Sequence, residues 1–194
     1  MDPNDHTLDV AREIASIAEA AGFAPILIGA AALAVHNFPR HTEDIDFAVA
    51  VEPDRMRALI PLLEAHGWTV EYGAPDFADP LGGVLTVSAR DSLPVQIVNF
   101  LNPPANGIPA LHRSAVLSPV TLPGIKVADL PHLIAFKLYE GGSESARDIV
   151  ELLIRNDIDL EDVREVCRRF RLERRLKAIL PPDLKRNRGR AHKT

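Results

Sequence analysis

The chain has 194 residues, of which 46% are hydrophobic and 25% are charged, with a formal net charge of −5. These values are typical of a soluble globular protein with one domain, or one domain and a helical extension. The single cysteine, Cys167, excludes an intramolecular disulfide. The N-terminus lacks the pattern of a signal peptide, and no apolar run approaches the roughly 20 residues of a membrane helix. We therefore expect a cytoplasmic protein with no membrane partner.

The charge is distributed unevenly along the chain. Residues 164–194 contain 12 Lys and Arg against 3 Asp and Glu, a local charge of +9, whereas residues 1–163 have a local charge of −14. The last part has no apolar periodicity, so we expect residues 183–194 to form a disordered basic tail. Such a tail is either an electrostatic arm for nucleic acid or a solvated terminus.

The first two thirds of the chain alternate apolar stripes of helical period with short β-branched runs. The stripes predict helices at residues 6–21, 29–38 and 54–66. The short runs predict strands at residues 25–28, 45–51, 68–72, 84–89 and 95–101. Residues 102–124 are rich in Pro and Gly, and we expect a connection there with one short helix near Leu111.

From Asp129 onward the pattern is helical. It predicts helices near residues 129–140, 143–155, 159–170 and 172–179. This order indicates an α+β fold, a mixed sheet flanked by helices and followed by a C-terminal helical bundle. The expected division is an α+β domain over residues 1–122, a helical region over 123–182 and the basic tail.

Two short motifs suggest a ligand site. A buried strand runs into Gly29-Ala30 at the start of a helix, and Asp44-x-Asp46 opens the next strand. Side chains two apart on a strand share a face, so the two aspartates lie side by side. Free N–H groups at a helix start bind phosphate, and paired carboxylates bind Mg²⁺. Asp157-Ile158-Asp159 repeats the tripeptide between two helices, where aspartates are common caps, so the glycine turn and the strand context must support the first copy.

Gly29-Ala30 followed by Asp44-x-Asp46 resembles the signature of the polymerase-β-like nucleotidyltransferases. Residues 32–46 are similar to the A-L…h-G…R-x-T-x-D-I-D pattern of a branch that includes the AbiEii-type toxins of toxin–antitoxin pairs. Residues 133–138 and 147–153 are similar to the Lys helix and the R…K-D-x-x-D-L helix of that branch. The matches extend over residues 26–153.

The resemblance implies a nucleotidyltransferase-like fold and transfer of a nucleoside monophosphate from an NTP to a hydroxyl of tRNA, another RNA or a protein. It also implies Mg²⁺ or Mn²⁺ and a cognate antitoxin as partner. Paired carboxylates that hold two metal ions can activate a hydroxyl and steady the leaving pyrophosphate. The implied metal ligands are Asp44 and Asp46. The implied nucleotide-binding residues are Gly29, Ala30, Arg40, Thr42 and Lys137. The implied catalytic residues are Asp44, Asp46, Lys137 and Asp148.

Each of these residues has a structural alternative. Asp44 could be a helix or turn cap, Gly29 a plain strand-to-helix turn, and Arg40 and Thr42 surface or turn residues. Ala30 stands where the family has Gly or Ser, so it offers a backbone N–H and no hydroxyl.

Lys137 and Asp148 fall on the inward faces of their helices, where a charge needs a partner. They either pair as a structural salt bridge, or Lys137 reaches the triphosphate while Asp148 helps to orient the acceptor or base.

The third carboxylate of the family is the main departure. The equivalent position on the strand at residues 95–101 is Gln96, which cannot accept a proton at neutral pH. Glu71 or Asp148 could replace it, water could take the proton, or catalysis could be lost.

Three functions follow. The basic tail favours an RNA acceptor. An aminoglycoside-type adenylyltransferase is the first alternative, which an acidic surface around residues 75–91 would favour. A catalytically dead relative that binds nucleotide or a partner protein is the second.

Overall fold

The structure, a computed structural model, describes residues 3–75, 80–102 and 108–182. Within them, seven strands form one mixed sheet with the order β3-β4-β5-β2-β1-β7-β6. The strands are β1 (Ile26–Ile28), β2 (Ile45–Val49), β3 (Thr69–Gly73), β4 (Val84–Ser88), β5 (Val95–Asn99), β6 (Val120–Leu122) and β7 (Ile125–Val127). The helices are α1 (Pro3–Ala20), α2 (Gly29–Val35), α3 (Pro53–Glu64), α4 (Pro109–Leu117), α5 (Leu130–Glu140), α6 (Gly142–Arg155), α7 (Leu160–Arg169) and α8 (Glu173–Ile179).

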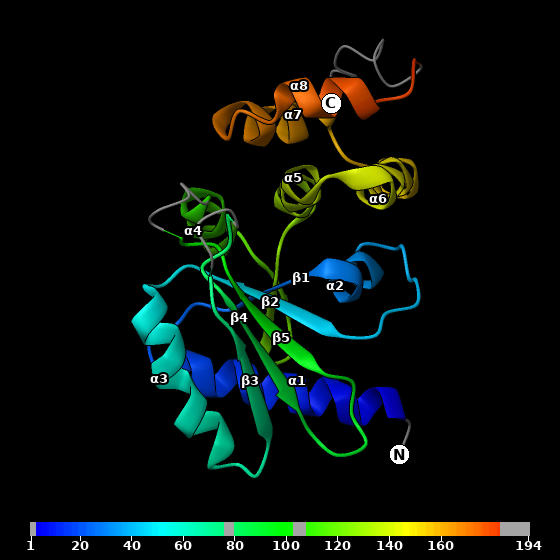
Figure 1. Cartoon of the computed structure of the whole chain (residues 1–194). Coiled ribbons are helices and arrows are strands. Elements are labelled where there is room, and N and C mark those ends of the chain that lie inside the picture. The colour runs from blue at the N-terminus through cyan, green and yellow to red at the C-terminus, as the bar shows by residue number, and fades with distance from the viewer. Residues whose placement is uncertain (1–2, 76–79, 103–107, 183–194) are drawn as a thin grey trace.

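The helices form layers around the sheet (Figure 1). Helices α1 and α3 lie together at one side of the sheet, and α5 and α6 lie at the other side. Helix α2 lies beside β1 and β2, below α5 and α6 in this view. Helices α7 and α8 form the outermost layer, beyond α5. The expected α+β fold with a mixed sheet and a C-terminal set of helices is confirmed.

The sheet has one apolar and one partly polar face, because successive side chains on a strand point to opposite sides. Leu27, Phe47, Ile97 and Leu85 are register partners across β1, β2, β5 and β4, and each is at most 2% exposed. They form the centre of the hydrophobic core. The opposite face has the row Ile28, Asp46, Gln96, Thr86 and Glu71 across β1, β2, β5, β4 and β3.

Strands β6 and β7 differ from the sequence prediction. Residues 102–124 contain β6 as well as the expected helix, α4, so the prediction of a strandless connection was wrong there. Strand β7 pairs in parallel with β1, with Leu27 opposite Val127, and Ala128 donates its N–H to the Leu27 carbonyl at 3.0 Å. The sheet thus continues past residue 122, the expected domain boundary, which falls inside the β6–β7 hairpin and stays a prediction.

The C-terminal helices bury most of their apolar stripes. Helix α5 packs against both α6 and α7, and burial raises the pKa of the Cys167 thiol on α7 to about 12. Cys167 is therefore a core residue without thiolate character at neutral pH. The expected disordered tail at 183–194 lies outside the described residues. None of the helices in the described ranges combines the length and the apolarity needed to cross a membrane.

Candidate active site

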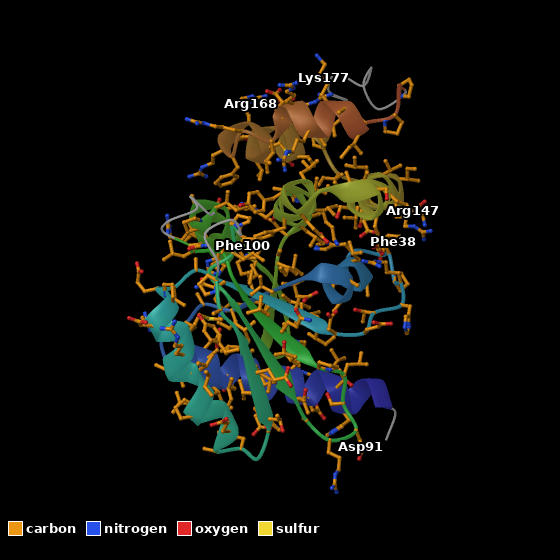
Figure 2. All side chains as sticks on the ribbon, viewed as in Figure 1. Phe38, Asp91, Phe100, Arg147, Arg168 and Lys177 are labelled. Carbon is orange, nitrogen blue, oxygen red and sulfur yellow. The ribbon has the colours of Figure 1, made fainter. Side chains whose placement is uncertain are left out.

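A cleft of about 740 Å³ lies between the polar face of the sheet and helix α5. Its lining comes from the glycine turn after β1, the loop and start of β2, the end of β5 and the inner side of α5. Part of the wall is aromatic: Phe100, labelled in Figure 2, meets Phe136 edge-on with ring centroids 5.1 Å apart, and Tyr139 lies 6.4 Å from it. The cleft therefore joins a polar floor to a wall on which a flat ring can pack.

Gly29 brings the backbone close to Asp46 on the cleft floor. Its φ is +66°, a conformation that favours glycine, and a Cβ at this position would lie 2.1 Å from Asp46 Oδ2. The backbone at the start of α2 can thus approach the Asp46 carboxylate only because residue 29 has no side chain. The glycine turn and the Asp-x-Asp pair, separated in the sequence, form one unit.

The two aspartates form a pair of carboxylates with too little positive charge around them. The pKa of Asp46 is raised from 3.8 to about 6, first by burial and then by the negative charge of Asp44. Glu140 raises this pKa further, while the positive charges of Lys137 and Arg40 lower it. A divalent cation at this position would relieve the repulsion.

The residues present suit Mg²⁺. This ion usually takes one or two protein carboxylates and completes its shell with water and substrate phosphates. Asp44 and Asp46 supply two carboxylates, and the side-chain carbonyl of Gln96 could add a third oxygen. In the described parts of the chain, no group of three or more His, Cys, Asp or Glu is arranged to hold a metal. Any ion here would therefore depend on oxygens from the nucleotide.

Gln96 occupies the place expected for the third carboxylate. It is the register partner of Asp46 in the β2–β5 ladder, and its Nε2 donates a hydrogen bond to Asp44 Oδ2 at 2.9 Å. Thr42 fixes the same aspartate from the other side, since its Oγ1 donates to the Asp44 carbonyl at 2.8 Å. The amide thus orients Asp44 but offers no site for a proton.

Neither of the substitute acids suggested by the sequence is free to replace it. Glu71 is exposed on the edge strand β3, three strands from Asp46, which at about 4.8 Å per strand is roughly 14 Å away. The suggestion of Glu71 is therefore contradicted by the sheet order. Asp148 already forms two ion pairs. Its buried Oδ2 lies 3.3 Å from Lys137 Nζ and 3.5 Å from Arg40 Nη2.

A network of cations and carboxylates forms the α5–α6 side of the cleft. Lys137 Nζ also contacts Glu140 at 3.0 Å, and Arg40 pairs with Glu144. The side chains of Lys137 and Asp148 are only 6% and 2% exposed, so the structural salt bridge does form. Lys137 nevertheless lines the cleft, as does Arg40. The salt-bridge alternative is therefore realised, and contact of Lys137 with a triphosphate stays a prediction.

The structure places the sequence-predicted residues in two groups. Those that line the cleft are Gly29, Ala30, Arg40, Thr42, Asp44, Asp46 and Lys137. Asp148 is behind Lys137, in contact with it but not among the cleft residues. Sequence reasoning missed Glu140 and Glu144, although Glu140 is three residues after Lys137, a spacing that joins side chains on a helix. It also missed the aromatic wall, for which the sequence has no periodic signal.

No protein-family model and no curated protein sequence matches the chain. Among solved structures, the antibiotic-resistance factor ANT(2'')-Ia is similar at a TM-score of 0.51 and 15% identity, over 92% of this chain and 96% of that chain. Megavirus polyadenylate synthase is similar at a TM-score of 0.49 and 13% identity, over 80% of this chain and 32% of that chain. Terminal uridylyl transferase 4 from Trypanosoma brucei is similar at a TM-score of 0.38 and 18% identity, over 58% of this chain and 33% of that chain. The chain has the nucleotidyltransferase fold.

These similarities concern the fold of the chain. The chain spans nearly the whole of ANT(2'')-Ia but about a third of the length of the other two proteins. The identities are low, so the likeness identifies the fold and leaves substrate and acceptor to be argued from the residues.

Proposed function

We propose that the chain is a Mg²⁺-dependent nucleotidyltransferase that moves a nucleoside monophosphate from an NTP to a hydroxyl group. The observation that supports this best is the contact of Gly29 with Asp46 in the same cleft as Arg40 and Lys137. A carboxylate with a raised pKa in a cleft that also contains cations is a pattern found at functional sites. Asp44 and Asp46 would hold Mg²⁺ or Mn²⁺, which when bound would supply charge neutralisation and polarise the reacting oxygens.

The cations of the cleft would bind the triphosphate. Helix α2 has only seven residues, so its N-terminus adds little charge stabilisation. Arg40 and Lys137 are therefore the main cations for the phosphates, while Gly29 and Ala30 offer backbone N–H groups. The aromatic wall at Phe100 and Tyr139 would support the nucleobase by stacking.

We propose RNA, and tRNA in particular, as the acceptor, within an AbiEii-like toxin that has a cognate antitoxin. The choice of RNA is supported by the positive charge of the α7–α8 layer, where residues 164–177 contain seven Lys and Arg against two Glu. Arg168 and Lys177 are on the outer surface of this layer in Figure 2. Arg175 joins it to the cleft wall, because Nη1 donates to the carbonyls of Leu138 and Tyr139 at 2.9 and 3.2 Å. Sequence-independent RNA binding follows from such charge.

A cationic small molecule is the second candidate acceptor. The cleft is lined by three exposed glutamates, Glu43, Glu140 and Glu144, which would attract amines and repel phosphates. ANT(2'')-Ia, similar in fold, has been described in complex with adenylyl-2''-tobramycin. An acidic surface around residues 75–91 would also favour this candidate, but positions 76–79 of that segment lie outside the described residues.

The test is an incubation of the protein with Mg²⁺, each labelled NTP in turn, and either total tRNA or an aminoglycoside. We expect the wild type to transfer label to tRNA and the Asp46→Ala variant to transfer none. Label in the aminoglycoside alone would support the second candidate. Nucleotide binding without transfer to either acceptor would identify a catalytically dead relative, for which Gln96 is the main support. Unchanged metal and nucleotide affinity in Asp44→Ala and Asp46→Ala would contradict the site itself.

A further inference from the structure

The proposed transfer lacks a proton acceptor on the sheet. When an acceptor hydroxyl attacks the α-phosphorus, its O–H proton must leave as the new P–O bond forms and the bond to pyrophosphate breaks. The amide of Gln96, which faces Asp46, cannot take this proton at neutral pH. A carboxylate within reach of the same cleft would be the most direct replacement.

The carboxylates near the cleft differ in what surrounds them. Asp148 is 2% exposed and lies between two cations, so it is not accessible to an acceptor. Glu144 pairs with Arg40 at the rim. Glu140 lines the cleft with a side chain that is 61% exposed, and its negative charge raises the pKa of Asp46. It thus combines access to solvent-borne acceptors with closeness to the metal-binding pair.

We propose that Glu140, at the end of α5, is the general base that takes the proton of the acceptor hydroxyl. This inference rests on the proposed nucleotidyl transfer. The proton passes from the hydroxyl to a Glu140 carboxylate oxygen, the hydroxyl oxygen bonds to the α-phosphorus, and pyrophosphate departs with the electrons of the broken P–O bond. Glu140 would then release the proton to water through its exposed side.

Lys137 couples this role to nucleotide binding. Nζ of Lys137 is 3.0 Å from Glu140 and 3.3 Å from Asp148, so the Glu140 carboxylate is held in an ion pair. A triphosphate in the cleft would draw Lys137 toward its own charges and leave Glu140 free. The other charged or titratable groups that line the cleft are Arg40, His41, Glu43, Asp44, Asp46, Tyr139 and Glu144. Glu140 would therefore become an effective base only when the substrate is bound.

The experiment compares Glu140→Gln with Glu144→Gln and Glu43→Gln, the other two glutamates of the cleft. For each full-length protein we would measure NTP affinity by equilibrium binding and transfer by kcat against pH. We expect Glu140→Gln to bind NTP as tightly as the wild type or several-fold more tightly, since Lys137 loses its carboxylate partner. Its kcat should fall by about 10²-fold or more, without the acidic limb of the pH profile.

Glu140→Asp should restore part of kcat with its acidic limb, which a purely structural role would not predict. Glu144→Gln and Glu43→Gln should keep that limb, whatever their effect on affinity. If Glu140→Gln keeps kcat within about threefold, or if the limb disappears in one of the other two variants instead, Glu140 is not the base. If the wild type transfers nucleotide to no acceptor, the proposed function fails and this inference fails with it.

Discussion

Gln96 and Asp44 are joined by a 2.9 Å hydrogen bond in which the amide donates and the carboxylate accepts. Gln96 is also the ladder partner of Asp46, so one neutral residue neighbours both aspartates. The amide satisfies Asp44 in the metal-free protein and limits the number of like charges to two. Its presence thus favours a stable empty site over a strong metal site.

Gln96→Asp should reverse that preference. A third carboxylate would replace a hydrogen-bond donor by a like charge, so we expect a loss of roughly 1 to 3 kcal/mol in the free energy of unfolding without metal. Mg²⁺ should bind more tightly, because three carboxylates then face the ion. Urea unfolding in EDTA and in Mg²⁺ would measure both effects. Equal stability of the variant and the wild type in EDTA would show that the 2.9 Å bond contributes nothing.

The raised pKa of Asp46 predicts how stability depends on pH. Between 3.8 and about 6 the folded protein binds a proton that the unfolded chain has lost, so its stability should fall as pH rises through this window. The difference corresponds to roughly 3 kcal/mol at most. Asp46→Asn should remove the dependence and stabilise the metal-free protein at pH 7.5. The measurement is urea unfolding in EDTA at pH 4.5 and 7.5, and a variant less stable than the wild type at pH 7.5 would contradict it.

Gly29→Ala tests the contact on the cleft floor. The added Cβ would lie 2.1 Å from Asp46 Oδ2 at a φ of +66°, so the backbone or the carboxylate must move. We expect a stability loss of about 1 to 2 kcal/mol from the φ alone and a large loss of metal and nucleotide affinity. Gly67→Ala is a matched control, since its φ is +81° and nothing lies within 4 Å of the added Cβ. Similar nucleotide affinities in both variants would argue against the contact.

The Lys137–Asp148 pair should show strong coupling in a double-mutant cycle. Both side chains are nearly fully buried, so Lys137→Met or Asp148→Asn alone should cost roughly 2 to 4 kcal/mol by leaving a buried charge with fewer partners. The double variant should cost less than the sum. The surface pair Arg155 and Glu151, 47% and 33% exposed, is the control and should couple by at most about 0.5 kcal/mol. Additive effects at the buried pair would contradict an energetic link.

Sequence patterns predicted the parts of this fold that have strong local signals. The α5 and α6 helices and the strands that contain Asp46 and Gln96 have clear periodicity, so their positions agree with the structure to within a few residues. Strands β6 and β7 have three residues each and pair with each other, and β7 joins the sheet through β1, about 100 residues earlier. A local pattern contains no information on such a partner.

In the candidate site, too, local sequence patterns did not reveal which distant segments come together. The glycine turn and the Asp pair were visible as motifs, but the position of Glu71 depended on the strand order, which placed it at the far edge of the sheet. Glu140 has no motif of its own. Glu140 became a candidate only in the structure, because α5 lies over the sheet and the last turn of this helix lines the cleft.

The cleft is built from segments that are far apart along the chain, as in the pairing of Arg40 with Glu144, 104 residues later. This separation sets an order of events during synthesis. Of the two cations that lower the pKa of Asp46, Arg40 is synthesised just before the Asp pair and Lys137 long after it. We expect nucleotide binding to begin only after α5 has docked, which makes the site one of the last parts of the protein to form.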